Sequence, residues 1–148
     1  MYEVGRLAEL IRIEEPGGVL GITAEQISKI REAWNLSELP SAYVEFLSHM
    51  GVRAGRILRG TDAFFPTILR MKEWADEFFD ENSGTNSLPD GAIVFGMHQG
   101  YLVYWMSDTL TPDPEVVLCA EGDPNPLRTW SSFTAFLNSH YADEPGVK

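Results

Sequence analysis

The stretch that decides the fold reads Ala92-Ile-Val-Phe-Gly96, Met97-His-Gln-Gly100, Tyr101-Leu-Val-Tyr-Trp-Met106 and, after a Pro-containing turn, Glu115-Val-Val-Leu-Cys-Ala120. Short runs of β-branched and aromatic residues that end at Gly, Pro, Asn or Asp are typical of β-strands. The linker before Tyr101 is too short for a parallel return, which needs a dozen or more residues, so the strands must run antiparallel. The stretch therefore predicts a β-meander, and Ser131-Ser-Phe-Thr-Ala-Phe-Leu137 predicts a helix after it.

These strands are too apolar for a sheet with one face in water, so the rest of the chain must cover most of both faces. With 148 residues, one domain can bury roughly two thirds of its unfolded surface. We therefore predict a single α+β domain over residues 1–148, with an antiparallel sheet of five or six strands wrapped by helices. Within it we expect an N-terminal helix or a mobile arm in residues 1–21, the core in residues 22–141 and a tail in residues 142–148.

Helices are predicted ahead of the meander. Apolar residues at helical spacing in residues 4–11 favour a first short helix. Thr23 and Gln26 form the capping box that opens a second helix. Pro40 stands at the start of a third helix, and Gly51 stands where a left-handed residue would end it.

The segment between this third helix and the meander is less regular. Residues 56–59 and 63–65 are predicted as two short strands around a turn at residues 60–62. After Pro66 the apolar residues return to a helical period, which predicts a helix that ends near Asn82.

The formal net charge of −11 is unevenly distributed. Residues 1–60 hold seven Arg or Lys against eight Asp or Glu, whereas residues 61–148 hold four against fourteen. Direct binding to nucleic acid or to an anionic membrane is disfavoured, because phosphate contacts need clustered Lys and Arg. The acidic half favours a basic protein partner, although acidity that only maintains solubility fits the same composition.

The composition also predicts where the protein resides. Cys119 is the single cysteine, so no disulfide framework exists and a cytoplasmic location is expected. Charged residues interrupt the first thirteen positions, which argues against a signal peptide, and no run reaches the eighteen apolar residues of a membrane span.

Acidic side chains make up most of the candidate site. The predicted helix after Pro66 carries carboxylates that we place on the face opposite Trp74 and Phe78, where they could meet Lys and Arg of a partner. An ordinary solvated helix face is the competing interpretation. The candidate partner-binding residues are Glu73, Asp76, Glu77, Asp80, Glu81, Trp105, Asp108, Asp113, Glu115, Glu121 and Asp123.

Catalytic and cofactor chemistry has no comparable signature. His49, His98 and His140 are separated and do not match a metal-binding spacing, and Cys119 falls inside an apolar run. The Gly17-Gly18 pair lacks the strand and the Lys of a phosphate-binding loop. We therefore expect no catalytic residues, no metal and no cofactor.

Three motifs in this order resemble the SUKH superfamily, which includes fungal regulators of cell-wall assembly and many bacterial immunity proteins. They are Leu39-Pro40-x-x-Tyr43-x-x-Phe46-Leu47-x-x-x-Gly51, then Phe95-Gly96-x-x-x-Gly100-x-x-Val103-Tyr104, then Ser131-x-Phe133-x-x-Phe136-Leu137. The likeness covers roughly residues 20 to 141. The chain departs from the family pattern at Met97 and His98, where an acidic residue is common, and in its arginines at positions 53, 56 and 59.

The resemblance implies a noncatalytic protein-binding module that neutralises a toxic protein, often a nuclease of a bacterial polymorphic toxin. The alternative is a housekeeping intracellular scaffold or regulator with the same fold. A third possibility is a small-molecule enzyme or sensor, which a deep pocket ringed by acids with perturbed pKa values would support. The sequence leaves the toxin's chemistry and the oligomeric state open.

Overall fold

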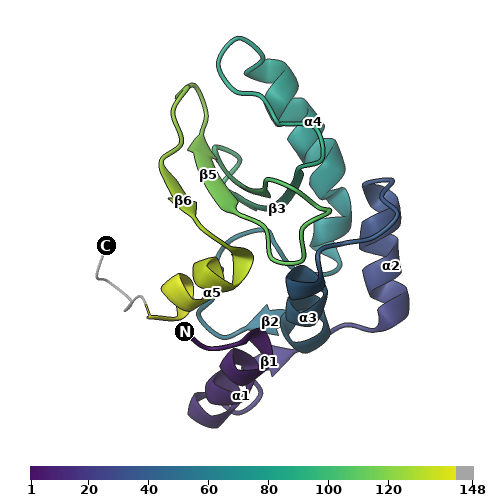
Figure 1. Ribbon diagram of the computed structural model, residues 1–148, viewed down its shortest axis with the longest axis vertical. Coiled ribbons are helices and arrows are strands. Elements are labelled where there is room, and N and C mark those ends of the chain that lie inside the picture. Colours follow the sequence, from purple (N-terminus) through teal and green to yellow (C-terminus); the bar gives the residue numbers. More distant parts are fainter. Residues whose placement is uncertain (143–148) are drawn as a thin grey trace.

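The computed structural model describes residues 1–142 (Figure 1). Its helices are α1 (Val4–Glu14), α2 (Ala24–Ala33), α3 (Ser41–Met50), the short 3-10 helix η1 (Thr67–Arg70), α4 (Met71–Glu81) and α5 (Phe133–Ala142). Its strands are β1 (Val19–Leu20), β2 (Arg53–Ala54), β3 (Ile93–His98), β4 (Leu102–Met106), β5 (Val116–Ala120) and β6 (Arg128–Trp130). Apart from Ala142, the predicted tail lies outside the described residues.

The predicted meander is confirmed: β3, β4, β5 and β6 form an antiparallel sheet in that order. The fourth strand, β6, escaped the sequence analysis because it has only three residues, two of them exposed. β1 and β2 pair separately as a two-stranded antiparallel sheet. The described residues thus form six strands within one compact α+β domain, but the strands are divided between two sheets.

One face of the meander packs on α5 through aromatic side chains. The ring centroids of Phe95 on β3 and Phe133 on α5 lie 5.3 Å apart, and those of Tyr104 on β4 and Phe136 on α5 lie 5.4 Å apart. Tyr43 of α3 joins the same cluster, with its ring centroid 5.6 Å from that of Phe133. The two contacts of Phe133 are edge-to-face, and packing of this kind adds to the burial energy of each ring. This cluster ties the third helix, the meander and the last helix into one core.

The other face of the meander is covered by α4 and by the segment that follows it. α4 packs on β3, and Figure 1 shows it running beside that strand. The Asn86 side chain donates to the Asp123 carbonyl and accepts from the Gly122 amide, which fastens the segment after α4 to the β5–β6 turn. Cover on both faces explains why the strands are apolar throughout.

The predicted hairpin at residues 56–59 and 63–65 is wrong, because residues 56–59 form consecutive turns and residues 63–65 are irregular. Leu58 has a φ of 55°, outside the strand region, and its amide donates to Nδ1 of His140 at 3.4 Å. The strand of this region lies earlier, at β2, and Asp62 forms an isolated bridge with Met97. The burial of Ile57 and Leu58 accounts for the strand-like apolar pattern.

The predictions for the helices before the meander are confirmed, except at the C-terminal end of α3. The capping box of Thr23 and Gln26 is confirmed, and α1 is a helix that packs on α3 and α5. Gly51, however, has a φ of −67° and is not left-handed. Glycine is needed there because a Cβ would lie 2.6 Å from the Leu47 carbonyl oxygen and 2.9 Å from Cγ1 of Ile22.

Candidate partner-binding surface

Helix α4 carries half of the candidate carboxylates. Its buried side chains are Met71, Ala75 and Phe78, which form the stripe that a helix needs to pack on a sheet. The helix continues directly from η1, so no side-chain cap marks its start. The carboxylates Glu73, Asp76, Glu77, Asp80 and Glu81 are all exposed.

The structure divides these five carboxylates into two groups. Glu73, Asp76 and Asp80 lie on the outward side, where Arg70 Nη2 is 3.4 Å from Glu73 Oε2 and Lys72 Nζ is 2.7 Å from Asp76 Oδ1. Both ion pairs are exposed and therefore weak, but each reduces the local negative charge. Asp80 makes no ion pair among the described residues.

The second group lines a hollow between α4 and the β3–β4 turn. Asp62, Glu77 and Glu81 contribute the acidic groups of this hollow, and Trp74, Phe78, Met97 and Gly100 complete its lining. Its volume is about 280 Å³. We call it the acid-rimmed hollow.

The predicted separation of the carboxylates from the aromatic face is wrong for Glu77 and Glu81. These residues are three and seven positions after Trp74, and residues at such spacings share one side of a helix. Both consequently line the same hollow as Trp74 and Phe78. Asp62 was missed altogether, because the sequence placed it in a turn and its bridge to β3 depends on tertiary structure.

The acid-rimmed hollow is suited to a cation with an apolar stem. None of its lining residues is a Lys or Arg, so its three carboxylates carry no compensating charge from the lining. Arg70 lies over the Trp74 ring at 5.2 Å but pairs with Glu73. The methylenes of an incoming Lys or Arg can lie on the aromatic surface while its charged group reaches the carboxylates.

The remaining candidate residues lie at the two ends of the meander. Glu121 is at the same end as the hollow, because its amide donates to the Tyr101 carbonyl in the β3–β4 turn at 2.8 Å. Asp123 follows in the β5–β6 turn at this end. Residues 107–115 connect β4 to β5 at the opposite end. The structure therefore does not bring Asp108, Asp113 and Glu115 together with the hollow.

Three of these aspartates stabilise local structure. Oδ1 of Asp108 accepts from the Leu110 amide at 2.9 Å, and Oδ1 of Asp123 accepts from the Asn125 amide at 3.0 Å. A hydrogen bond from an Asp side chain to the amide two residues later defines an Asx turn. Because this contact is local, an Asp in a predicted turn can indicate it from the sequence. Asp113 accepts from the Thr134 amide at 2.9 Å, a contact with the first turn of α5 that sequence spacing could not reveal.

Trp105 is not an exposed aromatic anchor. It is half-buried in β4 and lines a small hollow of about 110 Å³ with Val117, Cys119 and polar residues of the flanking loops. Burial raises the pKa of the Cys119 thiol, and the neighbouring Trp105 indole partly offsets this effect. A raised thiol pKa disfavours the thiolate, so Cys119 behaves as a small apolar residue.

Among residues 1–142, no three or more His, Cys, Asp and Glu side chains are grouped so that they could hold a metal ion. Within the same residues, no helix is both long and apolar enough to cross a membrane.

Together, the meander, its covering helices and the separate two-stranded sheet define a small α+β protein of the SUKH type. The chain belongs to the SMI1 / KNR4 family (SUKH-1), whose sequence profile matches residues 21–139. Comparison with curated proteins and with solved structures gave no match. Membership of this family supports a protein-binding role, of the toxin-immunity or the SMI1/KNR4-like kind.

Proposed function

We propose that the chain is a noncatalytic immunity protein that binds and neutralises a basic toxin domain, such as a nuclease of a bacterial polymorphic toxin. The acid-rimmed hollow carries this proposal, because it combines an apolar lining with carboxylates from two separate elements. Nuclease active sites that bind phosphates present Lys and Arg, and these are the side chains that the hollow can accept.

In this proposal the contact is centred on Glu77 and Glu81. Asp80 and Glu121 extend the acidic surface around the hollow, and their field increases the rate at which a basic partner arrives. The remaining carboxylates, at the other end of the sheet, would then contribute mainly to the long-range electrostatic field that attracts a basic partner. They are Asp108, Asp113 and Glu115. We expect neutralisation by occlusion in the cytoplasm, a location with which a chain of one cysteine is compatible.

Affinity capture from extracts of the native host tests the proposal. The bait is the tagged chain, compared with the double variant Glu77→Lys/Glu81→Lys and with the control Glu25→Lys/Glu38→Lys, which reverses two exposed carboxylates elsewhere. We expect a basic protein to be retained by the wild type and the control and to be lost from the hollow variant. Equal capture by all three baits would exclude the hollow as the contact.

The identity of the captured protein separates the two roles that the family allows. An immunity protein should retain a protein with a toxic activity, which is assayed with and without the added chain. A housekeeping scaffold, the alternative role, should retain an intracellular protein whose activity the chain does not block.

A further inference from the structure

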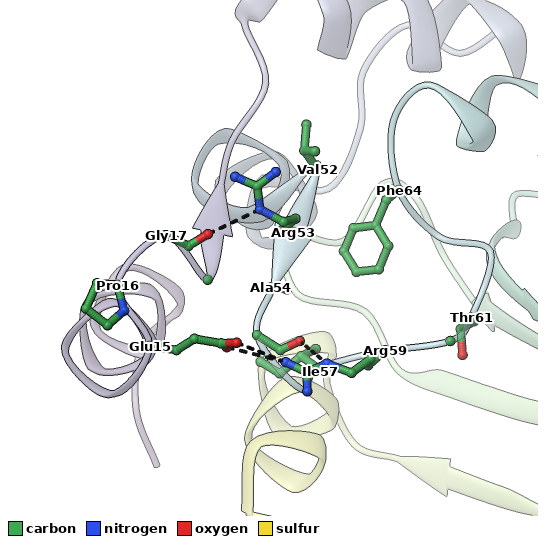
Figure 2. A pocket seen from close by; sticks show the side chains of 13 residues that line it. Glu15, Pro16, Gly17, Val52, Arg53, Ala54, Ile57, Arg59, Thr61 and Phe64 are labelled. Atoms are coloured by element: carbon green, nitrogen blue, oxygen red, sulfur yellow. Dashed lines mark hydrogen bonds and ion pairs between the residues drawn. The ribbon is translucent and has the colours of Figure 1, made fainter.

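A second hollow, with different lining residues, lies beside the two-stranded sheet. Its volume is about 380 Å³, and it is bounded by the turn after α1, by β2 and by the turns that lead to Phe64. Figure 2 shows Phe64 directed toward β2, with Arg53 on the strand and Arg59 below it. We call this site the arginine groove.

The arginine groove differs in charge from the rest of the surface. Residues 1–60 are nearly neutral although the whole chain has a formal net charge of −11, and Arg53, Arg56 and Arg59 fall within seven consecutive positions. Arg53 and Arg59 line the groove, whereas Arg56 is directed to α5, where its Nε donates to the Tyr141 carbonyl. The groove is therefore a local basic site on an acidic protein.

The backbone holds both groove arginines by one nitrogen. Nε of Arg53 donates to the Gly17 carbonyl at 3.2 Å, and Nε of Arg59 donates to the Gly55 carbonyl at 3.1 Å (Figure 2). Among residues 1–142, Arg53 makes no ion pair. Its two terminal nitrogens remain available, and a pair of guanidinium N–H groups is the donor geometry that a carboxylate accepts best.

A carboxylate of the chain itself already contacts the other arginine. Oε2 of Glu15 lies 3.3 Å from Nη2 of Arg59, and both side chains are more than half exposed. An exposed pair at this distance is weak and exchangeable. An incoming carboxylate can therefore replace Glu15, and Glu15 acts as an internal competitor for the site.

The groove also offers apolar surface. Val52 and Phe64 are both half-buried and line the groove, and Phe64 packs against Phe46, with ring centroids 6.4 Å apart. Leu20, the register partner of Arg53 on β1, is 46% exposed beside the groove. An occupant should consequently combine carboxylates with apolar side chains.

We propose that the arginine groove binds an extended acidic peptide segment of a partner protein, with one carboxylate on Arg53, a second on Arg59 and an apolar side chain against Phe64. Nucleic acid fits less well, because its continuous phosphate charge would be repelled by the acidic remainder of the protein. This site is distinct from the acid-rimmed hollow, so the inference does not depend on the proposed function.

Fluorescence anisotropy with a fluorescein-labelled Glu-Phe-Glu-Phe-Glu-Phe peptide tests this inference on the full chain. The comparison peptides replace every Glu by Lys or every Phe by Ser. We expect the acidic aromatic peptide to bind the groove more tightly than the Ser-containing peptide, since only the former supplies both kinds of contact. The Lys peptide should contact the acid-rimmed hollow instead, so its binding should not change in Arg53→Gln. Equal binding of the Phe-containing and Ser-containing acidic peptides would overturn the proposal.

Single substitutions identify the site. Arg53→Gln should weaken binding of the acidic peptide by about tenfold, because a charge-assisted contact is lost. Glu15→Gln should strengthen it by about two- to fivefold, since the internal competitor is removed. Arg6→Gln is the matched control, because it removes the same charge from an exposed arginine of α1 that pairs with Glu9.

Three results would contradict the site assignment. They are an Arg53→Gln effect no larger than that of Arg6→Gln, an unchanged or weaker affinity in Glu15→Gln, and tighter binding of a single-stranded oligothymidine than of the acidic peptide. Sedimentation velocity adds a further outcome, since self-association abolished by Arg53→Gln without peptide binding would assign the groove to a second copy of the chain. Circular dichroism verifies that each variant is folded.

Discussion

Gly21 is required at its position because neighbouring atoms leave no room for a side chain. An ideal Cβ on Gly21 would lie 1.7 Å from the carbonyl oxygen of Ser48 and 2.5 Å from its carbon. Those atoms belong to the backbone of α3, so they cannot rotate away as a flexible side chain would. The close approach of Gly21 lets the chain cross the third helix just before α2 begins.

Gly21→Ala should therefore destabilise the fold strongly. We expect a loss of roughly 2–4 kcal/mol in the free energy of unfolding, because α3 or the 19–22 segment must move to relieve the overlap. Urea denaturation followed by circular dichroism measures it. Gly84→Ala is the matched control: no heavy atom lies within 4 Å of its ideal Cβ, so it should change stability by less than about 0.5 kcal/mol. Similar stabilities for the two variants would contradict the packing described for Gly21.

At the scale of the element, α2 depends on its first turn. Oγ1 of Thr23 accepts from the Gln26 amide at 3.2 Å, and Oε1 of Gln26 accepts from the Thr23 amide at 2.9 Å. Ile30 is the one buried residue of this helix, whereas each of the other α-helices buries at least three, so tertiary packing does less for α2 than for them.

Thr23→Ala should lower the free energy of unfolding by about 1 kcal/mol, because an amide at the helix start loses its acceptor. Thr23→Ser, which keeps the hydroxyl, should retain most of the stability. Thermal denaturation distinguishes the variants, and an Ala variant as stable as the Ser variant would show that the cap contributes nothing.

Local signals made some elements predictable and left others hidden. The capping box of α2 and the meander strands could be predicted, since turn residues and apolar runs are local features. The two residues of β1 and the two of β2 have no local signature, and they form a sheet only because the long-range register places Val19 opposite Ala54. The candidate site shows the same limit: Glu77 and Glu81 were proposed from α4, but Asp62 joins them only through its bridge to Met97.

On the scale of the whole molecule, the aromatic core couples stability to alkaline pH. Burial raises the pKa of Tyr43. Burial also raises the pKa of Tyr104, and the positive charge of Arg128 partly offsets that increase. Both rings belong to the cluster that joins α3, the meander and α5. A raised pKa in the folded state means that folding favours the neutral phenol.

The stability that comes from keeping these phenols neutral should accordingly be fully present below the unfolded tyrosine pKa of about 10. The free energy of unfolding should fall as pH rises above that value. Chemical denaturation at a series of pH values from 8 to 11 measures this slope. Tyr43→Phe removes the most buried phenol, whose hydroxyl has no hydrogen-bond partner among the described residues, and should make the decline shallower. Parallel declines in the wild type and in Tyr43→Phe would contradict the role assigned to this ring.

The two hollows also carry charges of opposite sign. The acid-rimmed hollow presents carboxylates at one end of the meander, and the arginine groove presents guanidinium groups beside the two-stranded sheet. A partner with both basic and acidic segments could engage both sites, which would fix its orientation as well as its affinity.

The most direct test of the central claim is the association rate constant of the captured partner, measured by stopped flow over a range of salt concentrations. The wild type is compared with Glu77→Gln/Glu81→Gln and with the control Glu25→Gln/Glu38→Gln. If the acid-rimmed hollow attracts a basic partner, the wild-type rate will fall steeply with added salt, and the hollow variant will associate more slowly and with a shallower salt dependence than the control. A wild-type rate that does not depend on salt, or identical salt dependences for the two variants, would contradict the account.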